Sequence, residues 1–96
     1  MISINIKDVA GTFAENKDIA QNLRVNTLMP ALEKGEAVIL DFGNVKGATQ
    51  SFVHSLISEP FRKYGSKTLD LIQFKDCNEF IKQIITIVTE YMQEAE

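Results

Sequence analysis

The stretch from Ala37 to Tyr64 constrains the fold more than any other part of the chain. Three consecutive apolar residues, Val38-Ile39-Leu40, run into Asp41 without a polar residue between them. Such a run is typical of a central strand buried on both faces, in a sheet covered by helices. Gly43-Asn44 then predicts a turn. The stretch therefore predicts a buried strand that delivers a polar loop to the helix that follows.

That helix is predicted to begin at Ala48 or Thr49 and to end at Gly65. Its apolar residues follow helical spacing and form one continuous face: Phe52, Val53, Leu56, Ile57, Phe61 and Tyr64. Pro60 lies inside the pattern and is expected to bend the helix, because proline lacks the backbone N–H. The cluster Thr49-Gln50-Ser51 stands at the helix start, where the backbone N–H groups lack partners and carry a partial positive charge.

The residues before Ala37 predict a strand and a helix. Ile2, Ile4 and Ile6 alternate with polar residues, as in a strand with one buried face. Positions 8 to 15 read as a turn or a short irregular passage, with Phe13 in the core. A helix opens at Asn16 or Lys17, with Asn16 as a good N-cap residue, and Pro30 predicts a kink or break between positions 26 and 30.

The residues after Gly65 predict a third strand and a last helix. The strand is expected from Ser66 to Phe74. Asp76 is expected to cap the helix, with Glu79 as its capping-box partner. Ile87 falls off the buried stripe of that helix and is expected to be exposed. The stripe itself is predicted to be Phe80, Ile81, Ile84, Ile85, Val88, Tyr91 and Met92.

This alternation predicts an α/β fold. We expect a single small domain over residues 1–96, with a mixed β-sheet flanked by helices in the order β-α-β-α-β-α. Right-handed crossovers would join its parallel strands.

Composition and charge exclude several classes of protein. The chain is 45% hydrophobic and 24% charged, as in an ordinary globular protein. Its net charge of −3 argues against a nucleic-acid binder, since such proteins carry a basic excess. A single cysteine, Cys77, excludes an internal disulfide and disfavours a zinc site. With neither a signal peptide nor a membrane-spanning stretch, a cytoplasmic location without membrane association is expected.

Two patterns suggest chemistry that the rest of the sequence does not complete. Ser51 and His54 lie three apart on a helix, but an orienting carboxylate and a nucleophile elbow are missing. Asp41-Phe42-Gly43 spells the metal-binding triplet of protein kinases, but without the glycine-rich loop, strand lysine and catalytic loop. The sequence therefore predicts no catalytic residue, no metal ligand and no cofactor.

The hydroxyls of Thr49 and Ser51 have two interpretations. Either they only cap the helix, or one of them is phosphorylated or contacts a partner. A phosphate at a helix N-terminus lies in a favourable field and adds a charge of about −1.5 to −2 at neutral pH. One covalent event would then change a binding surface without refolding the domain.

Three stretches of the chain together resemble the bacterial STAS-like domains of unknown function. They are VILDFGNVKGATQSFVHSLI, then FRKYG, then LDLIQFKDCNEFIKQIITIV. That family is similar to the STAS domains of anti-sigma factor antagonists, in which a strand is followed by an Asp-Ser-Ser-Gly loop and a helix. The first serine of that loop is phosphorylated by a partner kinase that is also the anti-sigma factor.

Residue by residue, the family's loop falls on positions 49–52. Asp falls on Thr49, the phosphorylated serine on Gln50, the second serine on Ser51, and glycine on Phe52. Gln50 has no hydroxyl to phosphorylate, so Ser51 or Thr49 takes that role only if the loop register differs. The resemblance thus implies the fold and a partner-binding surface.

Three hypotheses about function follow. The leading one is a non-enzymatic regulatory module in signal transduction. It would bind a protein partner, a histidine-kinase-like ATPase or anti-sigma regulator, through Lys46, Gly47, Ala48, Thr49, Gln50, Ser51, His54 and Ser55. The alternative is a binder of small anions or nucleotides, or an enzyme, that uses the same helix N-terminus. The third is a homodimer to which exposed apolar residues such as Ile87 contribute.

Overall fold

Three parallel strands form the main sheet of the computed structural model, which describes residues 1–94. They are β1 (Ile2–Asn5), β3 (Val38–Asp41) and β5 (Ile72–Lys75), in the spatial order β1-β3-β5. The α/β class is confirmed. The sheet pairs only in parallel among the described residues, whereas a mixed sheet was predicted.

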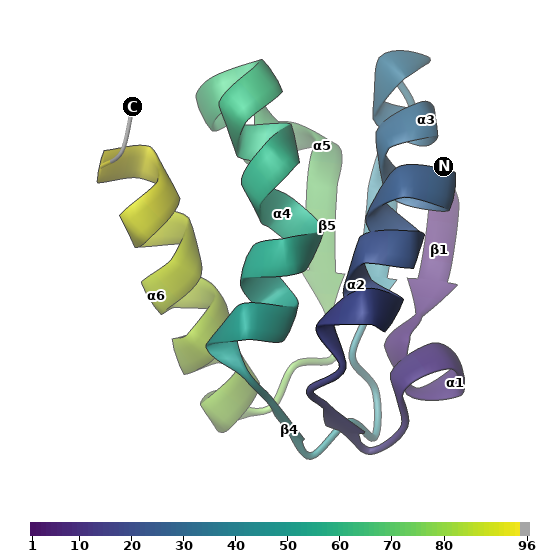
Figure 1. The fold of residues 1–96 in the computed structure, drawn as a ribbon, viewed down its shortest axis with the longest axis vertical. Helices are drawn as coiled ribbons and strands as arrows, with labels where there is room; N and C mark the ends of the chain where they lie inside the picture. Colours follow the sequence, from purple (N-terminus) through teal and green to yellow (C-terminus); the bar gives the residue numbers. More distant parts are fainter. Residues whose placement is uncertain (95–96) are drawn as a thin grey trace.

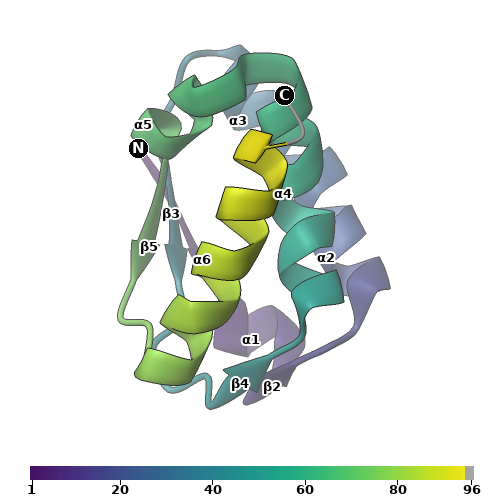
Figure 2. The same cartoon turned by 90° about the vertical axis from the view of Figure 1, so that its left-hand side faces the viewer.

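The three long helical segments cover one face of this sheet (Figures 1 and 2). They are α2 (Lys17–Leu23), which continues into α3 (Met29–Glu33), then α4 (Gln50–Tyr64) and α6 (Glu79–Glu94). The strand order advances in one direction, so right-handed crossovers place every connecting helix on the same side. In Figure 1, α4 lies in the middle of this layer, with α2 on one side and α6 on the other.

The prediction that Val38 to Leu40 is buried on both faces is wrong. Val38 and Leu40 are fully buried under the helices, but Ile39 lies on the uncovered face and is only partly buried. The core lies between the sheet and the helices, and its largest fully buried side chains are Phe42, Phe52 and Phe61.

A second, two-stranded parallel sheet lies at the end of the molecule where α4 begins. It pairs β2 (Phe13–Ala14) with β4 (Gly47–Ala48). A short helix, α1 (Ile6–Ala10), precedes it, and the side chain of Asn5 caps that helix by accepting from the Asp8 N–H at 3.1 Å. Positions 8 to 15 are thus more regular than the predicted turn. Phe13 is half exposed and not in the core.

The predicted irregularity before Pro30 is a π-helical segment, η1 (Arg24–Leu28), between α2 and α3. There the Met29 N–H donates to the carbonyl of Arg24, five residues back. Pro30 has no backbone N–H to donate, so the regular i→i−4 hydrogen bonds of the helix are interrupted here.

The third strand is shorter than predicted. Ser66 to Phe74 was expected to be extended throughout, but η2 (Gly65–Lys67) is a 3₁₀ turn and α5 (Thr68–Leu71) is helical, so β5 begins only at Ile72. The hydroxyl of Thr68 is fully buried and donates to the carbonyl of Pro60 at 2.9 Å. That bond ties α5 to α4.

The start and surface of α6 also differ from the prediction. Asp76 does not cap the helix; the side chain of Asn78 does, accepting from the Ile81 N–H at 2.8 Å. Phe80 and Tyr91 were assigned to the buried stripe but are exposed, while the exposure of Ile87 is confirmed. No helix within residues 1–94 has both the length and the apolar character needed to cross a membrane.

Candidate functional site

The loop that leads into α4 is fixed from two sides by hydrogen bonds to its backbone. The Lys46 N–H donates to the carbonyl of Thr12 at 2.7 Å, and the Thr49 N–H donates to that of Ala14 at 3.0 Å. On the other side, the side-chain amide of Asn78 donates to the Lys46 carbonyl at 3.0 Å. These hydrogen bonds hold the backbone of the loop in place at the start of α4.

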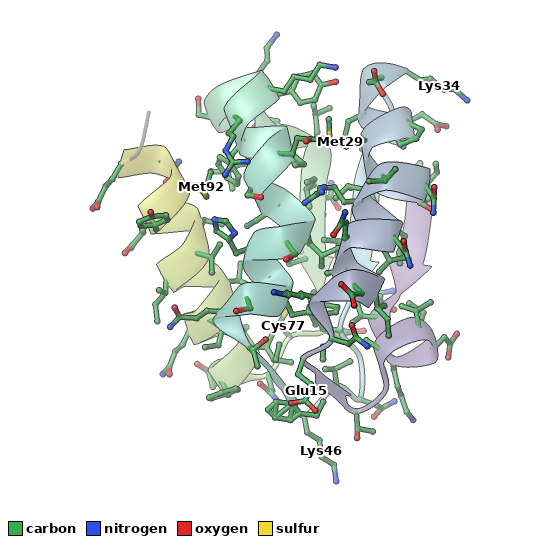
Figure 3. The ribbon with its side chains drawn as sticks, viewed as in Figure 1. Glu15, Met29, Lys34, Lys46, Cys77 and Met92 are labelled. Carbon is green, nitrogen blue, oxygen red and sulfur yellow. The ribbon has the colours of Figure 1, made fainter. Side chains whose placement is uncertain are left out.

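The predicted partner-binding residues of this loop differ in what they present to solvent. Gly47 and Ala48 are buried in β4 and contribute backbone only. Lys46 is exposed, and its side chain points away from the body of the molecule (Figure 3). The loop thus offers one cationic side chain on a buried backbone.

Thr49 and Ser51 have different roles at the start of α4. The Thr49 hydroxyl accepts from the Phe52 N–H at 3.1 Å, which makes Thr49 the N-cap residue. Ser51 is exposed on the first turn. Helix capping therefore explains the role of the Thr49 hydroxyl, whereas the exposed hydroxyl of Ser51 does not serve as the cap.

A groove of about 460 Å³ runs over this end of α4. Its polar wall consists of Gln50, Ser51, His54 and Ser55 of α4, with Lys17 of α2 at its edge. Its apolar wall is supplied by α6 and consists of Ile87, Val88 and Tyr91. A volume of this size is in the range of small-ligand sites. We call this feature the α4–α6 groove.

His54 connects the two walls of the groove. Its ring lies against that of Tyr91, with the ring centroids 6.4 Å apart and the planes inclined by 54°. Ser55 is half buried, and its carbonyl accepts from Nη1 of Arg24 at 2.8 Å, which ties α4 to η1. Five of the eight predicted residues thus lie on or beside one surface: Thr49, Gln50, Ser51, His54 and Ser55.

The residues of the two chemical patterns, Ser51 with His54 and Asp41 with Gly43, lie in different surroundings. Within residues 1–94, no carboxylate hydrogen-bonds to His54, and no group of three His, Cys, Asp or Glu side chains is arranged to hold a metal ion. The carboxylate of Asp41 instead accepts from the Gly43 N–H at 2.8 Å, which stabilises the turn after β3.

Cys77 lies in the link between β5 and α6 and is partly buried. Burial raises the pKa of its thiol, and the nearby Lys82 opposes that shift only partly. The thiol is therefore kept protonated at neutral pH, the opposite of what an activated nucleophilic cysteine needs.

The contributions of Lys17 and of α6 to the groove were not predicted from the sequence. Lys17 was noted only as a helix start, and Tyr91 was placed in the core. A signal for α6 was present, because its apolar residues cover more than one helical stripe. Which stripe would face α4 could not be derived from that pattern.

The comparisons with known proteins give one family match. The family model described as a STAS-like domain of unknown function matches residues 20–82, which include α4, the groove's polar wall and the start of α6. No curated protein and no solved structure matches the chain. Because the match covers more than half of the sequence, the chain belongs to the family of STAS-like domains of unknown function.

Proposed function

We propose that this STAS-like domain is a non-enzymatic regulatory module that binds a protein partner. The binding surface is the exposed part of positions 46–55, at the N-terminus of α4. The partner class is a histidine-kinase-like ATPase or anti-sigma regulator. The observation that carries the proposal is the position of Ser51, whose exposed side chain lines the α4–α6 groove while the neighbouring Thr49 hydroxyl serves the helix cap.

The physical setting of Ser51 suits a charge-controlled contact. The N-terminus of the 15-residue helix α4 favours negative charge. Lys17 lines the same groove, so a phosphate on Ser51 or an acidic partner side chain would find a cation nearby. Because the loop is held by β2 and by Asn78, such a charge would alter the surface and leave the fold intact.

The test is affinity capture from the native cell, read by mass spectrometry, with S51E against S66E. Ser66 is also exposed but lies in η2, at the opposite end of α4, so it controls for the added charge. We expect S51E to lose the captured partner and S66E to retain it. Equal capture by both variants would contradict the assignment of the surface. The captured wild-type chain is also examined for phosphate on Ser51 and Thr49.

A second candidate function, binding of a small anion or nucleotide, is favoured by the size of the groove and by Lys17 at its edge. Thermal shift with inorganic phosphate, phosphate esters and nucleotides tests it, since a bound ligand raises the melting temperature by mass action. A shift that K17A abolishes supports a ligand site in the groove. The absence of a shift with every anion argues against this function.

A further inference from the structure

The outer surface of α6 carries a second apolar stripe beside the buried one. Its members are spaced by four, three and four residues, the spacing at which helices pack against one another. Phe80 is 50% exposed, Ile87 48% and Tyr91 62%, with the half-buried Ile84 between them. We call these four residues the outer stripe. Its three exposed members share one face of the helix, as their spacing requires.

The buried stripe of the same helix has the same spacing and already accounts for the packing of α6 onto the core. It consists of Ile81, Ile85, Val88 and Met92. Of the outer stripe, Ile84 also packs against the core, whereas Phe80, Ile87 and Tyr91 are not part of this buried packing. An apolar surface along the helix, spaced for a second helix, is the geometry of helix-in-groove recognition.

The outer stripe is continuous with the candidate site at both ends. Near the start of α6, the rings of Phe80 and Phe13 both lie beside Gly47, at 3.5 and 3.6 Å from the position that a Cβ atom would take there. Further along, Ile87 and Tyr91 form the apolar wall of the α4–α6 groove. An occupant lying along α6 would thus also contact the proposed partner surface.

The charges that α6 itself carries beside the outer stripe are acidic, whereas Lys17 of α2 lines the groove together with Ile87 and Tyr91. Glu90, Glu94 and the uncharged Gln83 each follow a stripe residue by three positions, so they line one flank of the stripe. All three side chains are exposed. The cation of this helix, Lys82, pairs instead with Glu79 at 3.7 Å.

We infer that the outer stripe docks an amphipathic helix of the protein partner, one whose apolar stripe is flanked by Lys or Arg. Apolar contacts along α6 give the affinity, and the basic flank faces Glu90 and Glu94, which fixes the orientation. This inference rests on the proposed function, and it names the kind of segment that the partner supplies. A second copy of this chain is less complementary, because its own stripe brings the same acidic flank.

The test uses the full chain, labelled with ¹⁵N, and two synthetic helical peptides. Both have leucines at the spacing of the outer stripe; one carries lysines three residues after each leucine, and the other carries glutamates there. We expect the lysine peptide to bind and to shift the amide signals of α6. The glutamate peptide is expected to bind about fivefold more weakly or not at all, and E90K/E94K to reverse this preference.

Substitutions in the stripe provide the control for apolar docking. I87E/Y91E is expected to weaken lysine-peptide binding at least about tenfold, since it places charge in the contact. V25E, at an exposed valine of η1, is expected to bind as the wild type does. Far-UV circular dichroism verifies that the variants fold.

The opposite results overturn the inference. They are the absence of binding by the lysine peptide, binding that I87E/Y91E leaves unchanged, or a dimer in light scattering that I87E/Y91E dissociates. The experiments distinguish an error in the helix-docking inference from an error in the proposed function. If S51E still abolishes partner capture while no peptide binds α6, the helix-docking inference alone is wrong. If the peptide binds as expected but S51E still captures the partner, the assignment of the partner-binding surface around Ser51 is wrong.

Discussion

The hydroxyl of Thr49 and the backbone N–H of Phe52 are joined by a hydrogen bond of 3.1 Å that closes the first turn of α4. Loss of an N-cap side chain typically costs about 1 kcal/mol. We therefore expect T49A to lower the free energy of unfolding by about that amount in urea denaturation. T49S and T49D keep an acceptor oxygen and should stay close to the wild type. A T49D variant as unstable as T49A would contradict the capping role.

The buried hydrogen bond from Thr68 to the carbonyl of Pro60 gives a second prediction. T68V keeps the shape of the side chain but removes the donor, so we expect a loss of about 1 kcal/mol in the free energy of unfolding. T68S keeps the donor and loses only a methyl group. If T68V is as stable as the wild type, the bond is not what fixes α5 against α4.

The parts of the fold that could be predicted depend on local signals. The start of α4 at Thr49 and its end at Gly65 follow from capping preferences and from the conformational freedom of glycine, and both are confirmed. The π-helical segment before Pro30 is the irregularity that proline imposes on its own helix. In each case, the residues that determine the structure lie within a few positions of it.

The parts that could not be predicted depend on distant contacts. Strands β2 and β4 have two residues each, too few to show a period, and they exist because positions 13–14 and 47–48 meet in space. The run Val38-Ile39-Leu40 is apolar throughout, so the sequence could not show that helices cover only one face of β3 and leave Ile39 on the other. The same holds for the site: the polar wall on α4 could be named from one stretch, but its apolar wall on α6 depends on how two helices pack.

Two glycines should respond differently to alanine. Gly35 has a φ of 78°, which is strained for any residue with a Cβ, so G35A is expected to cost about 1 kcal/mol of stability. Gly47 is not at positive φ, and an added Cβ would meet Phe80 and Phe13 only at ordinary contact distances. We expect G47A to stay within about 0.5 kcal/mol of the wild type.

The control for Gly35 is G35N, since asparagine tolerates the left-handed conformation better than alanine does. Thermal or urea unfolding of the three variants measures the differences. A G47A variant less stable than G35A would mean that the packing of Phe13 and Phe80 around β4 is tighter than these distances indicate.

Cys77 makes stability depend on pH in the alkaline range. Its pKa is raised by burial, so the folded state holds the proton at pH values where the unfolded chain has lost it. The unfolded state then binds fewer protons than the folded one, and stability falls as pH rises. The contribution is fully present below the ordinary thiol pKa, and it is lost as pH rises through the higher pKa of the folded chain.

Urea denaturation of the wild type and C77A at a series of alkaline pH values measures this contribution, because the other titrating groups are common to both chains. We expect the stability of the wild type to fall more steeply with pH than that of C77A. Reaction of the folded chain with a thiol reagent should also begin at higher pH than reaction of the unfolded chain. Parallel pH profiles would mean that folding does not raise the pKa of this thiol. Rapid reaction of the folded chain at neutral pH would indicate an activated thiol and would reopen a catalytic role for this residue.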